Sequence, residues 1–346
     1  MLLTTSPGIE DITSTEIKEK LWNPDIQTNP FDLPGVVMLE SRTPQDDINT
    51  LKNFRSIHYI LSYQRFFDIN PEINPLEKIK ETIKQIDFWL TKDTKFRVTT
   101  KRYWKHNFTS MDIQMIAGET IDNLYPASVD LENPNTNIRV DVYHNKCFVG
   151  IQHNRNSLSI RFDKKYNERA ALKANTAYAI LRYISQNKLW WNLLDPFCWS
   201  WTILLEANYV YSNLNIIWTD IQKETLAKTY ENLKNYNLEK KIKLARVDAT
   251  KLTNFFEKNQ IDYIVTNPPY GIRLGRNLQY FDFYQKFLEE SREILKSNSE
   301  IVLIVLKKDT FENVLNNMEE KFTKIRRQKI EAGGLFPYIY HLKTIK

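Results

Sequence analysis

The stretch best suited to chemistry is Asn267-Pro268-Pro269-Tyr270, which directly follows the apolar run 261–266. The two prolines fix an extended backbone and hold the amide and the aromatic ring at the end of a strand. An amide oxygen and a neighbouring carbonyl can accept both hydrogens of an exocyclic amine, while the ring stacks on the base. Asn-Pro-Pro can also be a simple turn. The buried strand before it and the aromatic residue after it favour a site for a nucleobase amine.

Carboxylates close other apolar runs in the same half of the chain. Asp220 ends "NIIWTD" and Asp248 lies in "LARVDA". A carboxylate at the end of a second strand can accept hydrogen bonds from both hydroxyls of a ribose, as acidic residues do in dinucleotide-binding folds. A solvated strand-end Asp is the alternative for each. Asp195 ends the first apolar run, where it either binds a cofactor or holds the turn.

The elements that must position these residues alternate between strand and helix from about residue 188 onward. Continuous apolar runs such as "NLLDPF" and "EIVLIVLKK" indicate strands that are buried on both faces. The sequence therefore predicts an α/β, Rossmann-like domain with a doubly wound, mostly parallel sheet, whose ligands bind beyond the carboxyl ends of the strands. Every polar cluster named above falls at such an end.

The front of the chain alternates short strands and helices in two small α+β patterns. We expect four parts: 1–68 as a small α+β domain, 69–156 as a second small α+β domain, 157–187 as a basic linker with a connecting helix, and 188–346 as the Rossmann-like domain.

Composition limits the class of protein. The chain has 346 residues, with 48 Lys and Arg against 42 Asp and Glu, and this mild basic excess fits a polyanionic partner without requiring one. The five histidines have no metal-ligand spacing and two cysteines cannot form a zinc site or a disulfide framework, so no metal and a reduced, cytoplasmic protein are expected. No run approaches a membrane span, and the first thirty residues lack the apolar core of a signal peptide. A monomer is favoured, although nothing in the sequence sets the oligomeric state.

The motif "NPPY" resembles the catalytic motif of class I S-adenosylmethionine-dependent methyltransferases that act on exocyclic or amide nitrogens. In that family the first strand ends in an Asp-Pro-x-Cys-Gly-x-Gly-Thr turn, and "DPFCWSWT" matches it apart from both glycines. The resemblance implies S-adenosylmethionine as cofactor, with Asp220 at its ribose and Asp248 near its adenine amine. It further implies cofactor contacts from Asp195, Phe197, Cys198, Trp199, Ser200, Trp201, Thr202, Ile221, Ala249 and Asn267. The implied catalytic residues are Asn267, Pro268, Pro269 and Tyr270.

Residues 101–151 resemble the THUMP domain, an RNA-binding module that a ferredoxin-like domain precedes in many enzymes. The resemblance implies a ferredoxin-like domain at 1–68 and a THUMP domain at 69–156. Together with "NPPYGIRLGR" the pattern is most similar to the tRNA guanine-N2 methyltransferases of the acceptor stem, which implies N2 methylation of a guanosine of the guanosine-6 type. Ribosomal-RNA relatives share "NPPYG", so rRNA remains open, and DNA adenine or protein glutamine is a further alternative. The implied phosphate contacts, each of which could instead be an ordinary solvated basic residue, are Lys101, Arg102, Lys105, His106, Arg161, Lys164, Lys165 and Arg169.

Tryptophan stands where glycine is expected. Trp199 and Trp201 replace the two motif glycines, whose role is to let the backbone approach the cofactor. Taken literally, the chain should bind the cofactor poorly, and it could be an RNA-binding pseudo-methyltransferase. Relatives commonly have glycine at the positions of Trp104 and Trp218 as well. Trp190 and Trp22 also fall at turn or cap positions, whereas Trp89 and Trp191 have no such explanation.

Glycine is also scarce, at 8 residues where an average chain of this length would have about 24. The codons GGA and UGA differ by one base, and some bacterial lineages read UGA as glycine whereas others read it as tryptophan. We therefore hypothesise that the natural protein has glycine at several of these positions, in which case the chain is an active methyltransferase.

Overall fold

The computed structural model describes residues 1–41, 44–69, 74–163, 172–184, 191–197, 201–211, 213–271, 275 and 278–346. The chain forms two compact units. Unit 1 contains Met1–Thr5 and Ser14–Leu158, and unit 2 contains Ser6–Thr13 and Ser159–Lys346. The finer boundaries at residues 68, 156 and 187 stay predictions.

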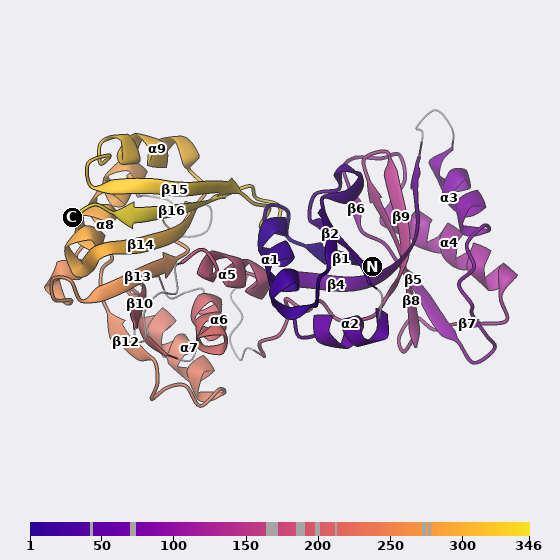
Figure 1. Ribbon diagram of the computed structural model, residues 1–346, viewed down its shortest axis with the longest axis horizontal. Helices are drawn as coiled ribbons and strands as arrows, with labels where there is room; N and C mark the ends of the chain where they lie inside the picture. The colour runs from indigo at the N-terminus through magenta and orange to yellow at the C-terminus, as the bar shows by residue number, and fades with distance from the viewer. Residues whose placement is uncertain are drawn as a thin grey trace. The chain divides into compact units, whose positions relative to one another are not determined.

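Unit 2 is built on a seven-stranded sheet with the order β12-β11-β10-β13-β14-β16-β15 (Figure 1). The first five strands in that order, β12, β11, β10, β13 and β14, pair in parallel. Strand β16 pairs antiparallel with both β14 and β15. The strands are β10 (Trp191–Asp195), β11 (Leu214–Asp220), β12 (Lys243–Arg246), β13 (Ile261–Thr266), β14 (Leu295–Val305), β15 (Phe322–Lys329) and β16 (Tyr338–Thr344). The prediction of an α/β, mostly parallel, Rossmann-like sheet is confirmed.

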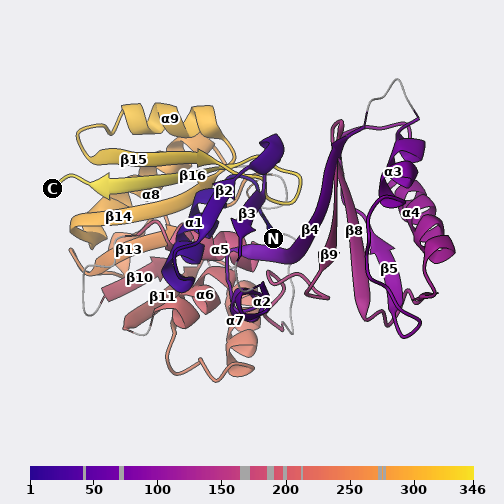
Figure 2. The same ribbon diagram turned by 45° about the vertical axis from the view of Figure 1, so that its right-hand side comes forward.

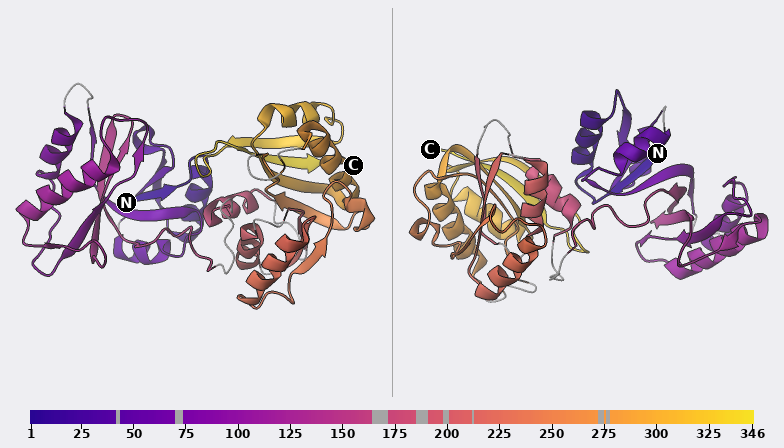
Figure 3. Two further views of the ribbon diagram at one scale, coloured as in Figure 1. Left: turned by 180° about the vertical axis from the view of Figure 1, so that it is seen from behind. Right: turned by 90° about the horizontal axis from the view of Figure 1, so that it is seen from below.

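Helices cover both faces of this sheet. The helices are α5 (Ala174–Leu181), α6 (Thr202–Val210), α7 (Lys223–Lys234), α8 (Tyr280–Ile294) and α9 (Lys308–Asn316), with a short 3-10 turn at Leu252–Asn254. Successive strand residues alternate between the two cores: Leu193 joins the cluster that contains residues of α5, α6 and α7, and Leu194 joins the cluster of α8 and α9. The right-hand view in Figure 3 shows the sheet between these two helical layers. This double burial explains why the strands read as continuous apolar runs.

Unit 1 is built on one nine-stranded sheet. Its order is β2-β3-β1-β4-β9-β8-β5-β7, with β6 paired to β8. The strands are β1 (Leu2–Thr5), β2 (Asp25–Thr28), β3 (Val36–Glu40), β4 (Ile57–Asp68), β5 (Lys95–Thr99), β6 (Arg102–Tyr103), β7 (Ser128–Val129), β8 (Thr136–Tyr143) and β9 (Lys146–Gln152). The long strand β4 pairs with both β1 and β9, so the two α+β patterns share a single sheet (Figure 2).

The helices of the front half are α1 (Glu10–Lys20), α2 (Pro44–Leu51), α3 (Pro75–Ile83) and α4 (Ser110–Leu124), with a 3-10 turn at Pro30–Asp32. Helix α4 begins with a complete capping box, in which Thr109 and Asp112 bond each other's backbone N–H groups. Ile113 and Ile121 of α4 pack with Ile79 and Ile83 of α3 in one buried cluster. Among the described helices none is long and apolar enough to cross a bilayer.

Candidate active site

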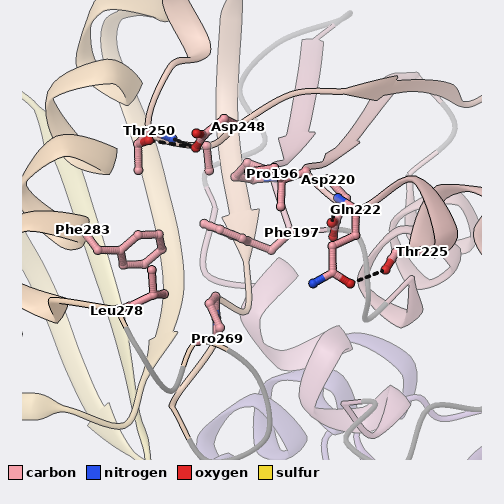
Figure 4. A pocket seen from close by; sticks show the side chains of 13 residues that line it. Pro196, Phe197, Asp220, Gln222, Thr225, Asp248, Thr250, Pro269, Leu278 and Phe283 are labelled. Carbon is pink, nitrogen blue, oxygen red and sulfur yellow. Dashed lines mark hydrogen bonds between the residues drawn. The ribbon is translucent and has the colours of Figure 1, made fainter.

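The strand ends of unit 2 enclose a cavity of about 340 Å³ (Figure 4). It lies at the carboxyl edge of the parallel strands, because residues after β10, β11, β12 and β13 all line it. A cavity of this size falls in the range of small-molecule sites. Six residues expected from the sequence line it: Phe197, Asp220, Ile221, Asp248, Ala249 and Pro269.

The two carboxylates of the cavity are held by their own turns. Asp220 Oδ1 accepts the backbone N–H of Gln222 at 2.8 Å. Asp248 Oδ1 accepts the backbone N–H and the hydroxyl of Thr250 at 2.9 and 2.8 Å. Such bonds to the next residues fix the carboxyl groups without using all their acceptor sites. The cavity therefore has two oriented acceptors on its wall.

An aromatic wall faces these acceptors. Phe197 packs against Phe283 and Phe287 of α8, with ring centroids 5.8 and 5.5 Å apart. Phe197 and Phe283 both line the cavity (Figure 4). Aromatic faces combined with a few oriented acceptors suit a flat heterocycle that carries polar groups.

Asp195 is fully buried and does not line the cavity among the described residues. Its Oδ1 accepts the backbone N–H of Phe197 at 3.1 Å and the hydroxyl of Thr266 at 2.6 Å. These bonds tie the end of β10 to the end of β13. Of the two roles considered for Asp195, the geometry favours holding the turn.

Burial raises the pKa of Asp195 to about 7, although the hydrogen bonds from Thr266 and Phe197 lower it. The folded protein therefore keeps a proton that an unfolded Asp, with a pKa near 3.8, has released. We expect the free energy of unfolding to fall as the pH rises from about 4 to about 7 and to level off above that. Asp195→Asn should flatten this part of the curve, as measured by urea unfolding across pH 4–8. Identical pH dependence of the two proteins would contradict the assignment.

The Asn267 motif lies beside the cavity. Asn267 is buried, with 2% of its surface exposed, and Pro269 lines the cavity. The hydroxyl of Tyr270 donates to Oδ1 of Asn267. Burial raises the pKa of Tyr270, so its hydroxyl stays protonated and able to donate. The structure thus brings the acceptor amide and the ring of the motif together at the cavity edge.

The cofactor turn is only partly described. Cys198, Trp199 and Ser200 lie outside the described residues, whereas Trp201 and Thr202 are buried at the start of α6. Trp201 packs in the apolar cluster of α5 to α7 and is not among the described residues that line the cavity. Its indole therefore occupies the core, which differs from the expectation that it fills the cofactor space.

Trp218 lies in β11 between β10 and β12 and is fully buried. Its indole Nε1 and the Oδ2 of Asp195 have no hydrogen-bond partner among the described residues. The indole N–H nevertheless lies close enough to Asp195 to lower the pKa of that carboxyl. Trp218 is therefore a neighbour of the buried carboxyl that ties β10 to β13.

Four of the basic residues expected to bind phosphate lie together in unit 1, in and on either side of β6. Arg102 donates to the carbonyl of Trp104 at 3.0 Å and contacts His106 Nδ1 at 3.2 Å. The Lys101 ammonium lies 4.4 Å from the Tyr103 ring centroid, and Lys105 is exposed. The structure therefore gathers Lys101, Arg102, Lys105 and His106 in one segment, and their contact with phosphate stays a prediction.

Arg161, for which the sequence resemblance implied a phosphate contact, forms an ion pair within the protein. Its Nε donates to the carboxylate of Glu206 at 2.6 Å, and Glu206 is fully buried within unit 2. Because a buried carboxylate needs a compensating charge, this arginine has a structural role in the protein. The other connector residues, Lys164, Lys165 and Arg169, lie outside the described residues.

We expect Arg161→Ala to lower the free energy of unfolding by about 1–2 kcal/mol, because it leaves Glu206 without this partner. Urea denaturation measures the change. Lys84→Ala removes an exposed ion pair with Glu81 and should cost far less. Equal effects of the two substitutions would show that the Arg161 pair is not structural.

Sequence reasoning missed several cavity residues. Thr250 and Gln222 each lie two residues after a predicted carboxylate, and that spacing could have indicated them. Leu278 and Phe283 come from the segment before α8 and from α8 itself, which carry no motif. The missed residues are Pro196, Gln222, Thr225, Thr250, Gly275, Leu278 and Phe283. Within the described ranges, no cluster of His, Cys, Asp and Glu could hold a metal ion.

Two family profiles match the chain. Residues 161–336 match the family described as "RMKL-like, methyltransferase domain", and residues 74–152 match the THUMP domain. The first match contains the whole cavity, and the second contains the basic segment around β6.

Similar proteins cover most of the chain. A tRNA (guanine(6)-N2)-methyltransferase of Thermus thermophilus is 31% identical over 251 residues, which are 72% of each chain. One of Archaeoglobus fulgidus is 28% identical across 97% of this chain and 90% of its own. The crystal structure of TrmN from Thermus thermophilus superposes with a TM-score of 0.76 at 26% identity, covering 99% of both chains. The structure of SMU.472, a putative methyltransferase complexed with SAH, shares the fold at a TM-score of 0.76 and 19% identity, covering 98% of this chain and 96% of that one.

Proposed function

This chain belongs to the RMKL-like methyltransferases with a THUMP domain, and on that premise we propose that it transfers a methyl group from S-adenosylmethionine to the N2 amine of a guanosine in tRNA. The observation that carries the proposal is the position of Asn267 and Tyr270 beside a cavity with two oriented carboxylates. The relatives at 28–31% identity are named for this reaction at guanosine 6. We propose the same nucleotide here.

The cavity fits S-adenosylmethionine. Asp220 can accept hydrogen bonds from the ribose hydroxyls and Asp248 from the adenine amine, while Phe197 and Phe283 provide apolar contact for the purine. The cavity volume of about 340 Å³ lies within the usual range for such ligands. When bound, the cofactor supplies a methyl group on a sulfonium leaving group, so the protein has to provide little beyond position.

The protein's own residues orient the amine. We propose that the N2 hydrogens are accepted by Asn267 Oδ1 and the Pro268 carbonyl, with the guanine replacing the Tyr270 hydroxyl at Oδ1. The released Tyr270 ring then stacks on the base. Holding the nitrogen in line with the methyl at near-attack distance provides most of the rate acceleration. The methylated nitrogen releases one proton to water, so a paired acid and base is not required.

The basic segment of unit 1, from Lys101 to His106, is proposed to contact the RNA backbone. Lysine and arginine contacts to phosphate supply affinity and position rather than sequence reading. The THUMP match over residues 74–152 supports an RNA partner for this unit.

Methyl transfer from labelled S-adenosylmethionine tests the RNA class. We call the variant with Trp199→Gly and Trp201→Gly the glycine form, and it is assayed beside the chain as written. Transfer to tRNA by the glycine form, with much less to rRNA and DNA, supports the proposal. Transfer to rRNA alone would show that the substrate is ribosomal RNA rather than tRNA. Tight binding of RNA with no transfer by either form would indicate a pseudo-methyltransferase.

A further inference from the structure

Two tryptophans have a backbone conformation that favours glycine. Trp104 has a φ of +87° and Trp89 a φ of +49°. In this left-handed region the Cβ atom crowds the following carbonyl, so ordinary L residues are strained there and glycine is not. Six tryptophans lie within the described residues, and two of them have positive φ: the six are Trp22, Trp89, Trp104, Trp191, Trp201 and Trp218.

Other residue types in this region fit the usual preferences. Ten described residues other than glycine have positive φ, and seven of them are Asn, Asp or His, which tolerate it. The remaining three are Phe31, Trp89 and Trp104. Nine of the ten values lie between 43° and 59°. The φ of Trp104 instead falls within the 63° to 97° range of the described glycines that have positive φ. Tryptophan at 104 is therefore the strongest departure from residue preference in the described chain.

The indoles at these positions do not offset the strain by burial. Trp104 is 71% exposed and Trp89 is 72% exposed. The turns depend on backbone groups instead: the Trp104 carbonyl accepts from Arg102, and the Trp89 N–H donates to Asp87 at 2.9 Å. A glycine would keep both bonds and remove the strain.

Trp191 provides the contrast. It is 5% exposed, and its ring packs edge-on against Tyr211 and Tyr263 with centroids 4.8 and 4.9 Å apart. Its φ is not positive. This tryptophan has the surroundings of a true core residue.

We propose that the natural protein has glycine at positions 89 and 104, and that both tryptophans arise from UGA codons that the source organism reads as glycine. The inference is independent of the reaction, because it rests on backbone conformation in unit 1. The proposal includes Trp89, a position for which no sequence motif indicated glycine. It also means that the exposed indole at 104, although it lies beside basic residues, is not a surface on which the protein stacks RNA bases.

The gene and the natural protein test the proposal together. We expect UGA at codons 89 and 104 and UGG at codon 191. Peptide mass spectrometry of the protein from its own organism should then show glycine at 89 and 104 and tryptophan at 191. UGG at either of the two codons, or tryptophan in either natural peptide, would overturn the proposal for that position.

Thermal unfolding gives a second, independent readout. Trp104→Gly and Trp89→Gly should each raise the midpoint by about 2–4 °C, since unit 1 has about 150 residues and relief of left-handed strain outweighs the loss of an exposed indole. At 104 that loss includes a contact with the His144 ring, whose centroid lies 4.5 Å from that of the indole. Trp104→Phe keeps the strain and should leave the midpoint unchanged, and Trp191→Gly should lower it. A lower midpoint for Trp104→Gly would mean that the indole stabilises this turn and that glycine is not its natural residue.

Discussion

Asn267→Ala, introduced into the glycine form, lowers methyl transfer to tRNA by about 10²–10³-fold, similar to the loss of one positioned hydrogen-bonding group in other active sites. The reason is that Oδ1 of Asn267, which holds the Tyr270 hydroxyl in the structure, is the acceptor proposed for the guanine amine. The affinity for S-adenosylmethionine changes little, because Asn267 does not line the cavity between Asp220 and Phe283. Single-turnover transfer and calorimetric binding measure the two effects.

Asn316→Ala is the matched control for this substitution. Asn316 ends α9 and is exposed, so its removal should change neither rate nor binding. If Asn267→Ala keeps full activity, the amide is not an acceptor for the reacting amine and the proposed role of the motif is wrong.

Asp220→Ala raises the dissociation constant for S-adenosylmethionine in the glycine form by about 10–150-fold. A carboxylate that accepts hydrogen bonds from ribose hydroxyls contributes about 1.5–3 kcal/mol, and that range gives this factor. Because the effect is on cofactor binding, saturating cofactor should restore most of the transfer rate. Isothermal titration measures the loss of cofactor affinity, and transfer rates at increasing cofactor concentration show whether the rate at saturation is restored.

Asp309→Ala controls for the loss of a negative charge, since Asp309 lies in the first turn of α9 with its carboxyl 92% exposed. It should bind the cofactor as well as its parent does. Unchanged affinity after Asp220→Ala would show that the ribose lies elsewhere in the cavity.

The sheet of unit 2 could be predicted because its strands are buried on both faces. Leu193 and Leu194 point into different cores, and a strand of this kind reads as an unbroken apolar run. The same reasoning placed Asp220, Asp248 and Asn267 at one edge, since parallel strands end together. The cavity between them confirms that geometry for Asp220 and Asp248.

Other features depend on contacts that no short stretch of sequence contains. Arg161 reads as a basic linker residue, and its pairing with Glu206 arises only when the connector meets α6, 45 residues later. The single sheet of unit 1 depends on β4, whose 12 residues are long enough to pair with β1 at one end and β9 at the other. Phe283 lines the cavity from α8, where a helical pattern shows which residues are buried but not what they face.

Tryptophan at expected glycine positions bears directly on activity. Sequence patterns pointed to Trp104 and Trp201 as positions where glycine is expected. The backbone at Trp104, with a φ of +87°, has a conformation that favours glycine. Trp201 is buried in the core with an irregular backbone of φ −17° and ψ −7° at the start of α6. Activity is therefore tested on the glycine form and on the chain as written, side by side.

Mass spectrometry of nucleosides from tRNA that has been incubated with the glycine form and S-adenosylmethionine tests the central claim most directly. We expect N2-methylguanosine, which appears only with the cofactor and is lost in the Asn267→Ala variant. A methylated adenosine, or unmodified tRNA despite measurable cofactor binding, would contradict it.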